Sequence, residues 1–351
     1  MPWIDKSQPR REYADYAIFT QGESTMRRTR ITAGVAAAVA IALVATTAVA
    51  TPPGGNGRLL YQRPSKHGIS DLFTIAADGS AAARIKRPGD EIEAAWSPDG
   101  SKIAFSATPG PDAPYEIWVE SADGSGLKRL TNHKAFSTAP AWSPDGSKIV
   151  YASDKDGPSS KADGDRSRLR LYSMGSDGSS KQRLVTVVGR DVTDPIWSPN
   201  GNTIAFAILN ATDAGFDSSI ATIAPDGTGR TQLTKPGGTD ELNPNWSPDG
   251  TTIAFELAKD FIKRQSDLAL MNADGSNVRR LTQTPVFETN PVWSPDGARI
   301  AFTSDRDNRS ISRDRLGDGF ELYTMAVDGS GMTRLTHNKV PEIFPDWAPV
   351  R

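Results

Sequence analysis

Short apolar runs alternate with polar turns at a regular interval along most of this chain. Each period opens with a tryptophan followed by a turn sequence, Ser-Pro-Asp-Gly or a close variant. The copies begin at Trp96, Trp142, Trp197, Trp246, Trp293 and Trp347, with Asn200 replacing Asp in the third copy and Trp-Ala-Pro in the last. An interval of roughly fifty residues is typical of β-propeller blades rather than of helical repeats.

Three further runs follow the tryptophan in each period, and together they describe one blade. In the first complete copy these runs are Ile103-Ala104-Phe105, Glu116 to Val119 and Arg129-Leu130-Thr131, with Asp123-Gly124 before the last. Short alternating runs bounded by Asp-Gly predict antiparallel strands joined by hairpin turns. In the tryptophan turn, Pro fixes φ at the second position and Gly accepts the positive φ that follows. Each period therefore predicts a four-stranded antiparallel blade.

The two ends of the array predict how the ring closes. The first period lacks a tryptophan strand and opens directly with Arg58-Leu59-Leu60-Tyr61, whereas a surplus strand remains at Pro345-Asp346-Trp347. Pairing that spare strand into the first blade would close the ring and leave no strand edge exposed at the seam. The sequence thus predicts an all-β, six-bladed β-propeller over residues 58–351, closed by the C-terminal strand completing blade one.

The repeat resembles the TolB-like propeller repeat, also called the WD40-like repeat. The resemblance rests on Trp-Ser-Pro-Asp-Gly, Ile-Ala-Phe, Ala/Ser-Asp-Gly-Ser and Arg-Leu-Thr, and it covers residues 58–351. It implies a propeller fold and says much less about function. TolB carries an α/β domain ahead of its propeller, whereas here only Thr51 to Gly57 separate an apolar segment from the first strand.

The N-terminal residues predict export. Residues 26–50 contain a basic start, the uncharged apolar stretch Ile31 to Ala50 and a small-residue end at Ala48-Val49-Ala50, the three parts of a signal peptide. About twenty apolar residues can also remain as a transmembrane signal anchor. Residues 51–57 are a linker, and residues 1–25 suggest a start assigned too early. Either interpretation places the propeller outside the cytoplasm, secreted or anchored to the cytoplasmic membrane.

The predicted binding surface is the face that carries the long connections between strands, because variable loops on a rigid scaffold commonly bind ligands. The loops that lead to the tryptophans are acidic, although the net charge of the chain is only −2. The candidate binding residues at this channel mouth are Glu91, Glu93, Phe136, Asp191, Asp194, Asp240, Glu241, Asn243, Phe287, Glu288, Asn290, Glu342 and Phe344. Their carboxylates would attract cations or a basic peptide, and their phenylalanines would form an apolar patch. The alternative is a solvated polar rim without a partner.

Two long loops, Ser153 to Arg168 and Ser304 to Gly319, invite a calcium interpretation. They contain Asp154-Lys155-Asp156-Gly157 and Asp305-Arg306-Asp307-Asn308, in which alternate residues offer oxygen ligands. Neither loop has the EF-hand spacing with its closing Glu, and Asp and Gly are also ordinary turn residues. We therefore expect no cofactor, with a divalent cation such as calcium as the alternative.

No catalytic motif is present. The chain lacks a Gly-x-Ser-x-Gly elbow, a phosphate loop and a His-Glu-x-x-His pair, and its three histidines are His67, His133 and His337. A pI near 6.0 without a basic stripe argues against nucleic-acid binding. We expect a monomeric, non-enzymatic module that binds a protein or peptide of the cell envelope. The alternative is a metal-dependent hydrolase or lyase acting on a sugar or lactone, with the cation held by carboxylates at the channel mouth.

Overall fold

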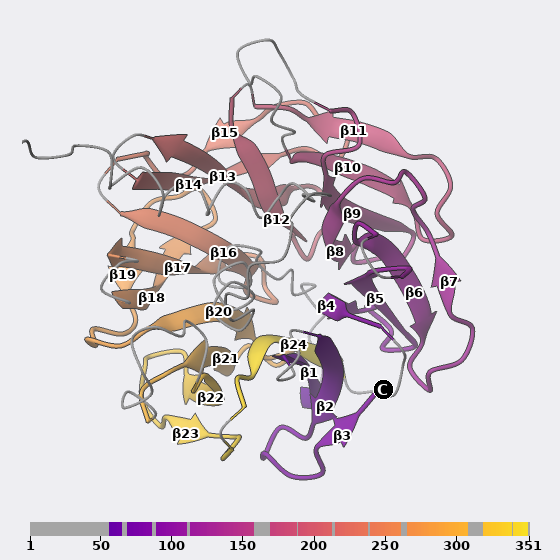
Figure 1. Cartoon of the computed structure of the whole chain (residues 1–351). Helices are drawn as coiled ribbons and strands as arrows, with labels where there is room; N and C mark the ends of the chain where they lie inside the picture. The colour runs from indigo at the N-terminus through magenta and orange to yellow at the C-terminus, as the bar shows by residue number, and fades with distance from the viewer. Residues whose placement is uncertain are drawn as a thin grey trace, which may run out of the picture.

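The computed structural model describes residues 56–349, apart from 65–68, 86–88, 111–112, 158–168, 188, 213–214, 238, 261–264, 308–318 and 339. These residues form six four-stranded antiparallel sheets around a central axis (Figure 1). The predicted six-bladed propeller is therefore confirmed. Within the described ranges there is no helix long and apolar enough to cross a membrane. The predicted signal segment, residues 26–50, and residues 1–25 lie outside the described residues.

In each blade the tryptophan strand is innermost and the later strands follow outward (Figure 1). Blade one consists of β24 (Ile343–Pro349), β1 (Asn56–Pro64), β2 (Ser70–Ile75) and β3 (Ala83–Arg84). Blade two consists of β4 (Glu91–Trp96), β5 (Lys102–Ala107), β6 (Glu116–Ser121) and β7 (Lys128–Arg129). Blade three consists of β8 (Ser137–Trp142), β9 (Lys148–Ser153), β10 (Arg170–Gly175) and β11 (Gln182–Val185). Blade four consists of β12 (Asp191–Trp197), β13 (Ile204–Thr212), β14 (Gly215–Ile223) and β15 (Thr231–Gln232). Blade five consists of β16 (Asp240–Trp246), β17 (Thr252–Asp260), β18 (Gln265–Asn272) and β19 (Arg279–Arg280). Blade six consists of β20 (Glu288–Trp293), β21 (Arg299–Ser304), β22 (Glu321–Ala326) and β23 (Thr333–Arg334).

The ring closes in blade one, as the surplus strand predicts. β24 pairs antiparallel with β1, with Leu59 opposite Trp347 and Leu60 opposite Asp346. β1 begins at Asn56, two residues before the predicted start of the propeller. A second link crosses the seam to the next blade, because the Asp346 carboxylate accepts a hydrogen bond from the Trp96 backbone N–H at 2.7 Å. The C-terminal strand is therefore bonded both within blade one and to blade two.

The six repeat tryptophans form the contacts between neighbouring blades. Trp142 of blade three, for example, is 1% exposed and packs against Ala104 and Ile117 of blade two. Its indole N–H also donates a hydrogen bond to the Ala95 carbonyl of that blade at 3.2 Å. Burying an aromatic side chain of this size stabilises the fold by several kcal/mol before entropy is counted, on the order of 4–6. Each tryptophan thus joins its blade to the preceding one.

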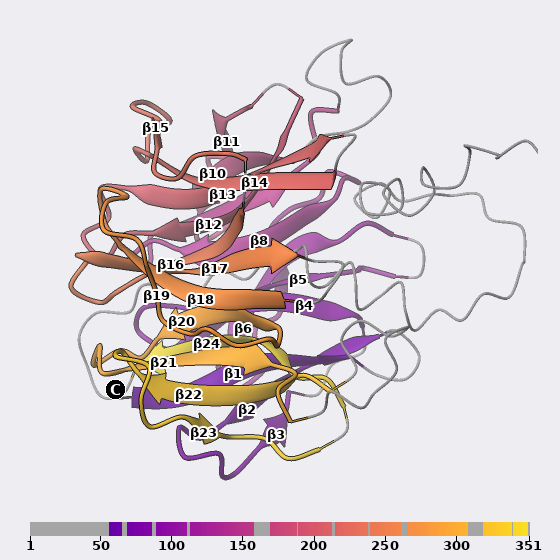
Figure 2. The same cartoon turned by 90° about the vertical axis from the view of Figure 1, so that its left-hand side faces the viewer.

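The tryptophan turns and the Asp-Gly turns all lie on one face of the ring, here called the turn face. In the first such turn the Ser97 hydroxyl donates to Asp99 at 2.6 Å and accepts from the Lys102 N–H, while Gly100 adopts a φ of 64°. The opposite face, here called the loop face, receives the hairpins between second and third strands and the connections to the tryptophan strands. The side view shows the strands running between these two faces (Figure 2). Every tryptophan strand therefore starts at the loop face, beside the channel.

Candidate functional site

The thirteen candidate residues occupy three repeated positions at the beginning of the innermost strands. Six residues before the tryptophan lie Phe136, Asp191, Asp240 and Phe287; five before it lie Glu91, Glu241, Glu288 and Glu342; three before it lie Glu93, Asp194, Asn243, Asn290 and Phe344. Because the tryptophan strands surround the axis (Figure 1), the fold gathers these residues from six blades around the loop-face end of the channel.

Most of these side chains are buried rather than open on a rim. Ten of the thirteen are at most 6% exposed, and the other three, Phe136, Asp191 and Asp240, are half-buried. These side chains therefore lie within the inner strands of the blades and not on an open, solvated rim. Their role in binding remains a prediction.

The position three residues before each tryptophan holds a strained bulge. All six residues there have positive φ, between 50° and 60°: Glu93, Ala139, Asp194, Asn243, Asn290 and Phe344. The pairing with the second strand slips at the same place in every blade, as between Ile92 and Ala95 in blade two. A bulge of this kind leaves one residue unpaired and redirects its side chain. Positive φ is uncommon for non-glycine residues and is retained where the surroundings impose it, often at functional sites.

Two of the buried carboxyl groups in the channel wall have strongly raised pKa values. Burial, with a smaller contribution from the charge of Asp194, raises the pKa of Glu93 to about 8 and that of Glu256 to about 7. One oxygen of Glu93 accepts from the Thr138 hydroxyl and from the Ala139 N–H at 2.8 Å. The other Glu93 oxygen and one Glu256 oxygen have no hydrogen-bond partner in the described structure. Such groups retain their protons near neutral pH and can donate or accept one.

Glu256 is a site residue that the sequence-based reasoning missed. It lies in β17, directly after the Ile253-Ala254-Phe255 run, and is 0% exposed. Its carboxylate accepts hydrogen bonds from Thr289 and from the Asn243 side chain at 2.8 Å. A signal was available, because an ionisable residue inside an otherwise apolar strand needs a buried polar neighbour. Sequence alone did not indicate that this neighbour comes from the channel wall.

The glutamates five residues before the tryptophan serve partly as buried ion-pair partners. Arg306 donates to Glu288, and Arg63 donates to Glu342. Glu288 also accepts from the Thr282 hydroxyl, and Glu342 accepts from the Asn338 side chain at 2.7 Å. These acids therefore hold loop-face arginines in place within the propeller.

The two aspartates six residues before the tryptophan bond to the preceding blade. The Asp191 carboxylate accepts from the Leu169 N–H at 2.8 Å, and the Asp240 carboxylate accepts from the Ser218 N–H at 2.9 Å. Each bond joins the innermost strand of one blade to the third-strand segment of the blade before it. Burial raises the pKa of Asp240 to about 6. The geometry gives both acids a structural role.

The predicted phenylalanine patch is largely enclosed. Phe287 and Phe344 are 1% and 3% exposed and belong to one cluster with Phe320 and Ile343. Phe136 instead packs edge-on against Tyr115, with ring centroids 5.7 Å apart. Phe287 and Phe344 are therefore enclosed among neighbouring strands, whereas Phe136 is half-buried. A role of the three rings in binding stays a prediction.

In the described part of the two long loops, the aspartates bind protein groups. Asp154 and Asp305 accept from the N–H groups of Phe136 and Phe287, and Asp156 and Asp307 accept from the hydroxyls of Tyr172 and Tyr323. Across the described ranges no cluster of three or more His, Asp and Glu side chains has a metal-binding arrangement. Whether the loops bind calcium stays open to experiment, since residues 158–168 and 308–318 lie outside the described residues.

The described histidines do not form a catalytic group. His133 is half-buried and His337 is exposed, each on a separate loop-face connection. Burial lowers the pKa of His133, which favours its neutral form. His67 lies outside the described residues. Glu93 and Glu256 accept hydrogen bonds from Thr138, Ala139, Thr289 and Asn243, and neither described histidine is among these partners.

These features define a class of protein: a closed six-bladed propeller whose channel wall carries buried acidic side chains near the loop face. Within that class, residues 110–242 and 160–350 match the model of the TolB β-propeller domain family. Together the two matches span more than half of the chain, which therefore belongs to the TolB β-propeller family.

A local sequence relative is the Tol-Pal system protein TolB of Anaeromyxobacter dehalogenans strain 2CP-C. The two chains are 32% identical over 85 residues, which are 24% of this chain and 19% of the relative. The alignment thus spans about a fifth of the relative's length.

Two solved structures share the fold. The crystal structure of TolB from Acinetobacter baumannii superposes with a TM-score of 0.65 at 21% identity, over 84% of this chain and 67% of that one. A putative TolB from Agrobacterium tumefaciens gives a TM-score of 0.57 at 18% identity, over 84% of this chain and 99% of that one. At these identities the likeness concerns the fold.

Proposed function

We propose that this protein is an exported binding module that recognises a protein or peptide partner in the cell envelope through the loop face. The observation that carries the proposal is the membership of the chain in the TolB β-propeller family, together with a loop face on which connections from all six blades meet around the channel. Loops on a rigid scaffold commonly carry binding residues. Membership of the family and the likeness to a Tol-Pal system protein support a partner that is a protein of the envelope.

The rigidity of the scaffold supports binding rather than a large conformational change. Every blade is joined to its neighbour by a buried tryptophan, and the ring is closed by β24. A preformed surface loses little conformational entropy when a partner binds. The propeller is therefore suited to recognition by a fixed surface, with specificity set by its loops.

Site-specific photo-crosslinking on the full chain tests which face binds. A photoreactive residue at His337 would report on the loop face, and one at Ser276 would report on the turn face as a matched control; both positions are exposed. We expect a discrete protein adduct from His337 and none from Ser276 in envelope extracts, with and without chelator. Adducts from Ser276 alone would refute the proposal. Loss of the His337 adduct on chelation, with a tightly held divalent metal in the purified protein, would favour the propeller enzyme instead.

A further inference from the structure

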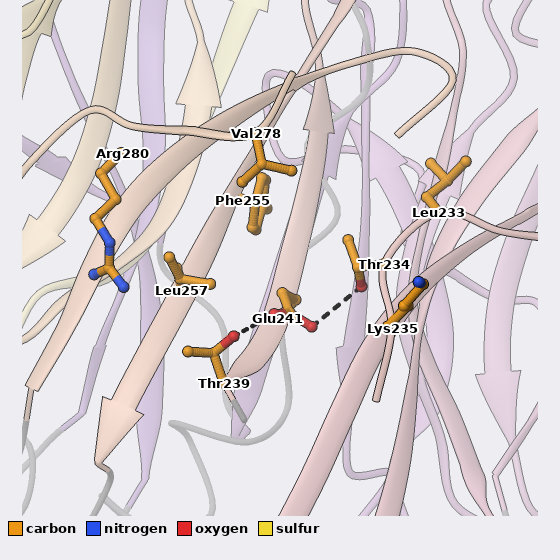
Figure 3. Close-up of a pocket in the computed structure, with 9 residues that line it drawn as sticks. All are labelled: Leu233, Thr234, Lys235, Thr239, Glu241, Phe255, Leu257, Val278 and Arg280. Atoms are coloured by element: carbon orange, nitrogen blue, oxygen red, sulfur yellow. Dashed lines mark hydrogen bonds between the residues drawn. The ribbon is translucent and has the colours of Figure 1, made fainter. Parts of the chain in front are cut away.

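A pocket of about 410 Å³ lies between blades four and five. Its walls are the apolar side chains of Leu233, Leu257 and Val278, and the Glu241 carboxylate lies between the hydroxyls of Thr239 and Thr234 (Figure 3). The volume falls within the range of small-ligand sites. Val278 is 53% exposed, an unusual state for a large apolar side chain, so the pocket combines accessible apolar surface with a nearly buried acid.

The strand pair beside this pocket lacks the stacked rings of two other blades. In blades one and six the central aromatic residue of the second strand stacks on an aromatic residue of the third, Tyr61 on Phe73 and Phe302 on Tyr323, at 5.5 and 5.7 Å. In blade five the residue paired with Phe255 is Ala269, and the Phe255 ring lines the pocket.

The same two blades also show what normally contacts the glutamate at this position. In blade six Arg306 donates to Glu288, with its guanidinium 5.2 Å from the centre of the Tyr323 ring. In blade one Arg63 donates to Glu342, with its guanidinium 4.2 Å from the Phe73 ring. In both, a cation from the same chain lies on the apolar wall of the blade and neutralises a buried acid. A buried carboxylate without such a partner is costly.

Glu241 has the same place in the repeat, five residues before its tryptophan, but a different set of partners. It is 6% exposed, and its two oxygens accept from the hydroxyls of Thr239 at 2.6 Å and Thr234 at 3.1 Å. No described cation bonds to it. Arg280, which also lines the pocket, pairs with Asp267 instead. Burial accordingly raises the pKa of Glu241.

We propose that this pocket binds a basic side chain, arginine or lysine, from a protein partner. The carbon stem of that side chain would lie against Leu233, Leu257 and Val278, and its cation would reach Glu241 as Arg306 reaches Glu288. The inference rests on the proposed function in taking the partner to be a protein, and it assigns one contact of that partner. Long basic side chains suit such a site, because they bury their stems while the charged end finds an acid.

Lys235, at the edge of the pocket, provides a second test, in which the change in ligand affinity should have the opposite sign. It lines the pocket and is exposed. Its ammonium group repels an incoming cation and would attract an anion. Removing Glu241 and removing Lys235 must therefore change the affinity for a basic ligand in opposite directions, and both directions reverse for an acidic ligand.

The experiment is a titration of the full-length protein with acetyl-Gly-Arg-Gly-amide and with the same peptide containing neutral citrulline. Methyl NMR spectra of Leu- and Val-labelled protein report on the pocket. We expect the arginine peptide to shift the methyl signals of Leu233, Leu257 and Val278, and the citrulline peptide to bind at least tenfold more weakly. Glu241→Gln should weaken arginine binding at least tenfold, and Lys235→Ala should strengthen it. Asp99→Asn, on the turn face, is the matched control and should change nothing.

Several results would overturn the proposal: equal binding of both peptides, no shift at the three pocket methyls, or unchanged affinity in Glu241→Gln with a native methyl spectrum. The proposed function fails separately. If the His337 crosslink forms equally in Glu241→Gln and in the unaltered protein, and the peptide binds both equally, the pocket is wrong and the binding module stands. If no crosslink forms but the arginine peptide binds as expected, the pocket stands and the envelope partner is wrong.

Discussion

The substitution Glu93→Gln tests the electrostatics of the channel wall. The ordinary pKa of a glutamate here is 4.5, and burial raises that of Glu93 to about 8. The folded state therefore holds the proton more tightly than the unfolded state between these two values. The stabilising contribution is complete below pH 4.5 and is lost as the pH rises to about 8. At about 1.4 kcal/mol per pH unit, raising the pH from 5 to 8 removes roughly 4 kcal/mol from the free energy of unfolding.

Glutamine retains the shape and the acceptor oxygen but cannot ionise. Its carbonyl can still accept from the Thr138 hydroxyl and the Ala139 N–H, which bond to one Glu93 oxygen in the folded protein. We therefore expect Glu93→Gln to match the unaltered protein at pH 5, within about 1 kcal/mol, and to be more stable by several kcal/mol at pH 8. Such a difference is large against a typical total stability of about 5–15 kcal/mol.

Urea denaturation at pH 5, 6, 7 and 8, followed by tryptophan fluorescence, measures this difference. Asp99→Asn is a suitable control, because a hydrogen bond from Ser97 lowers the pKa of Asp99 to about 2. That acid contributes stability above its ordinary value and loses it only as the pH falls toward 2, so its removal should not alter the trend between pH 5 and 8. If Glu93→Gln and the unaltered protein lose stability in parallel over this range, Glu93 is not a buried neutral acid and the reasoning fails.

Two further pairs of variants test the contacts between blades. Gly275 and Gly124 both have a φ of 84°, but a Cβ at Gly275 would lie 2.6 Å from the Leu233 carbonyl oxygen of the preceding blade, whereas one at Gly124 meets no described atom within 4 Å. Both alanine variants should lose about 1–2 kcal/mol of unfolding free energy, because alanine is strained at this φ. Gly275→Ala should lose about 1–3 kcal/mol more because of the clash. Urea denaturation measures both losses, and equal losses would contradict the contact. Asp346→Ala should lower the free energy of unfolding by about 1–3 kcal/mol, because it leaves the buried Trp96 N–H without its acceptor. Asp346→Asn keeps an acceptor oxygen and should lower it clearly less. Thermal unfolding compares the two variants, and equal losses would show that the bond is unimportant.

The blades could be predicted from the sequence because each signal lies within one period. A tryptophan, a Pro-Asp-Gly turn and an apolar run such as Ile103 to Phe105 occur together in the chain, and local hairpin formation depends on little else. The closure by Trp347 was predictable for the same reason, since one incomplete period at each end leaves one strand to pair.

The candidate site was less predictable because its geometry comes from neighbouring blades. Glu241 and Glu288 have similar flanking sequences, yet Arg306 bonds to one and only hydroxyl groups bond to the other among the described side chains. The pocket beside Glu241 is lined by Leu233 of blade four and by Leu257 and Val278 of blade five, which are apart in sequence and are brought together only by the fold. The repeat pattern placed the acids at the loop-face end of the inner strands, but their burial and their partners could be known only from the fold.

The joining of β24 to β1 has a consequence for how the protein is made. The strand that completes blade one is synthesised after all the other strands, so blade one must wait with an open edge while five complete blades emerge. Pairing segments so far apart in the chain is slow, because the intervening length costs loop-closure entropy. During that delay the free edge of β1 could accept the terminal strand of a second molecule, which would give a domain-swapped dimer. A low concentration of unfinished chains would favour closure of each ring on itself, because the swap needs a second molecule.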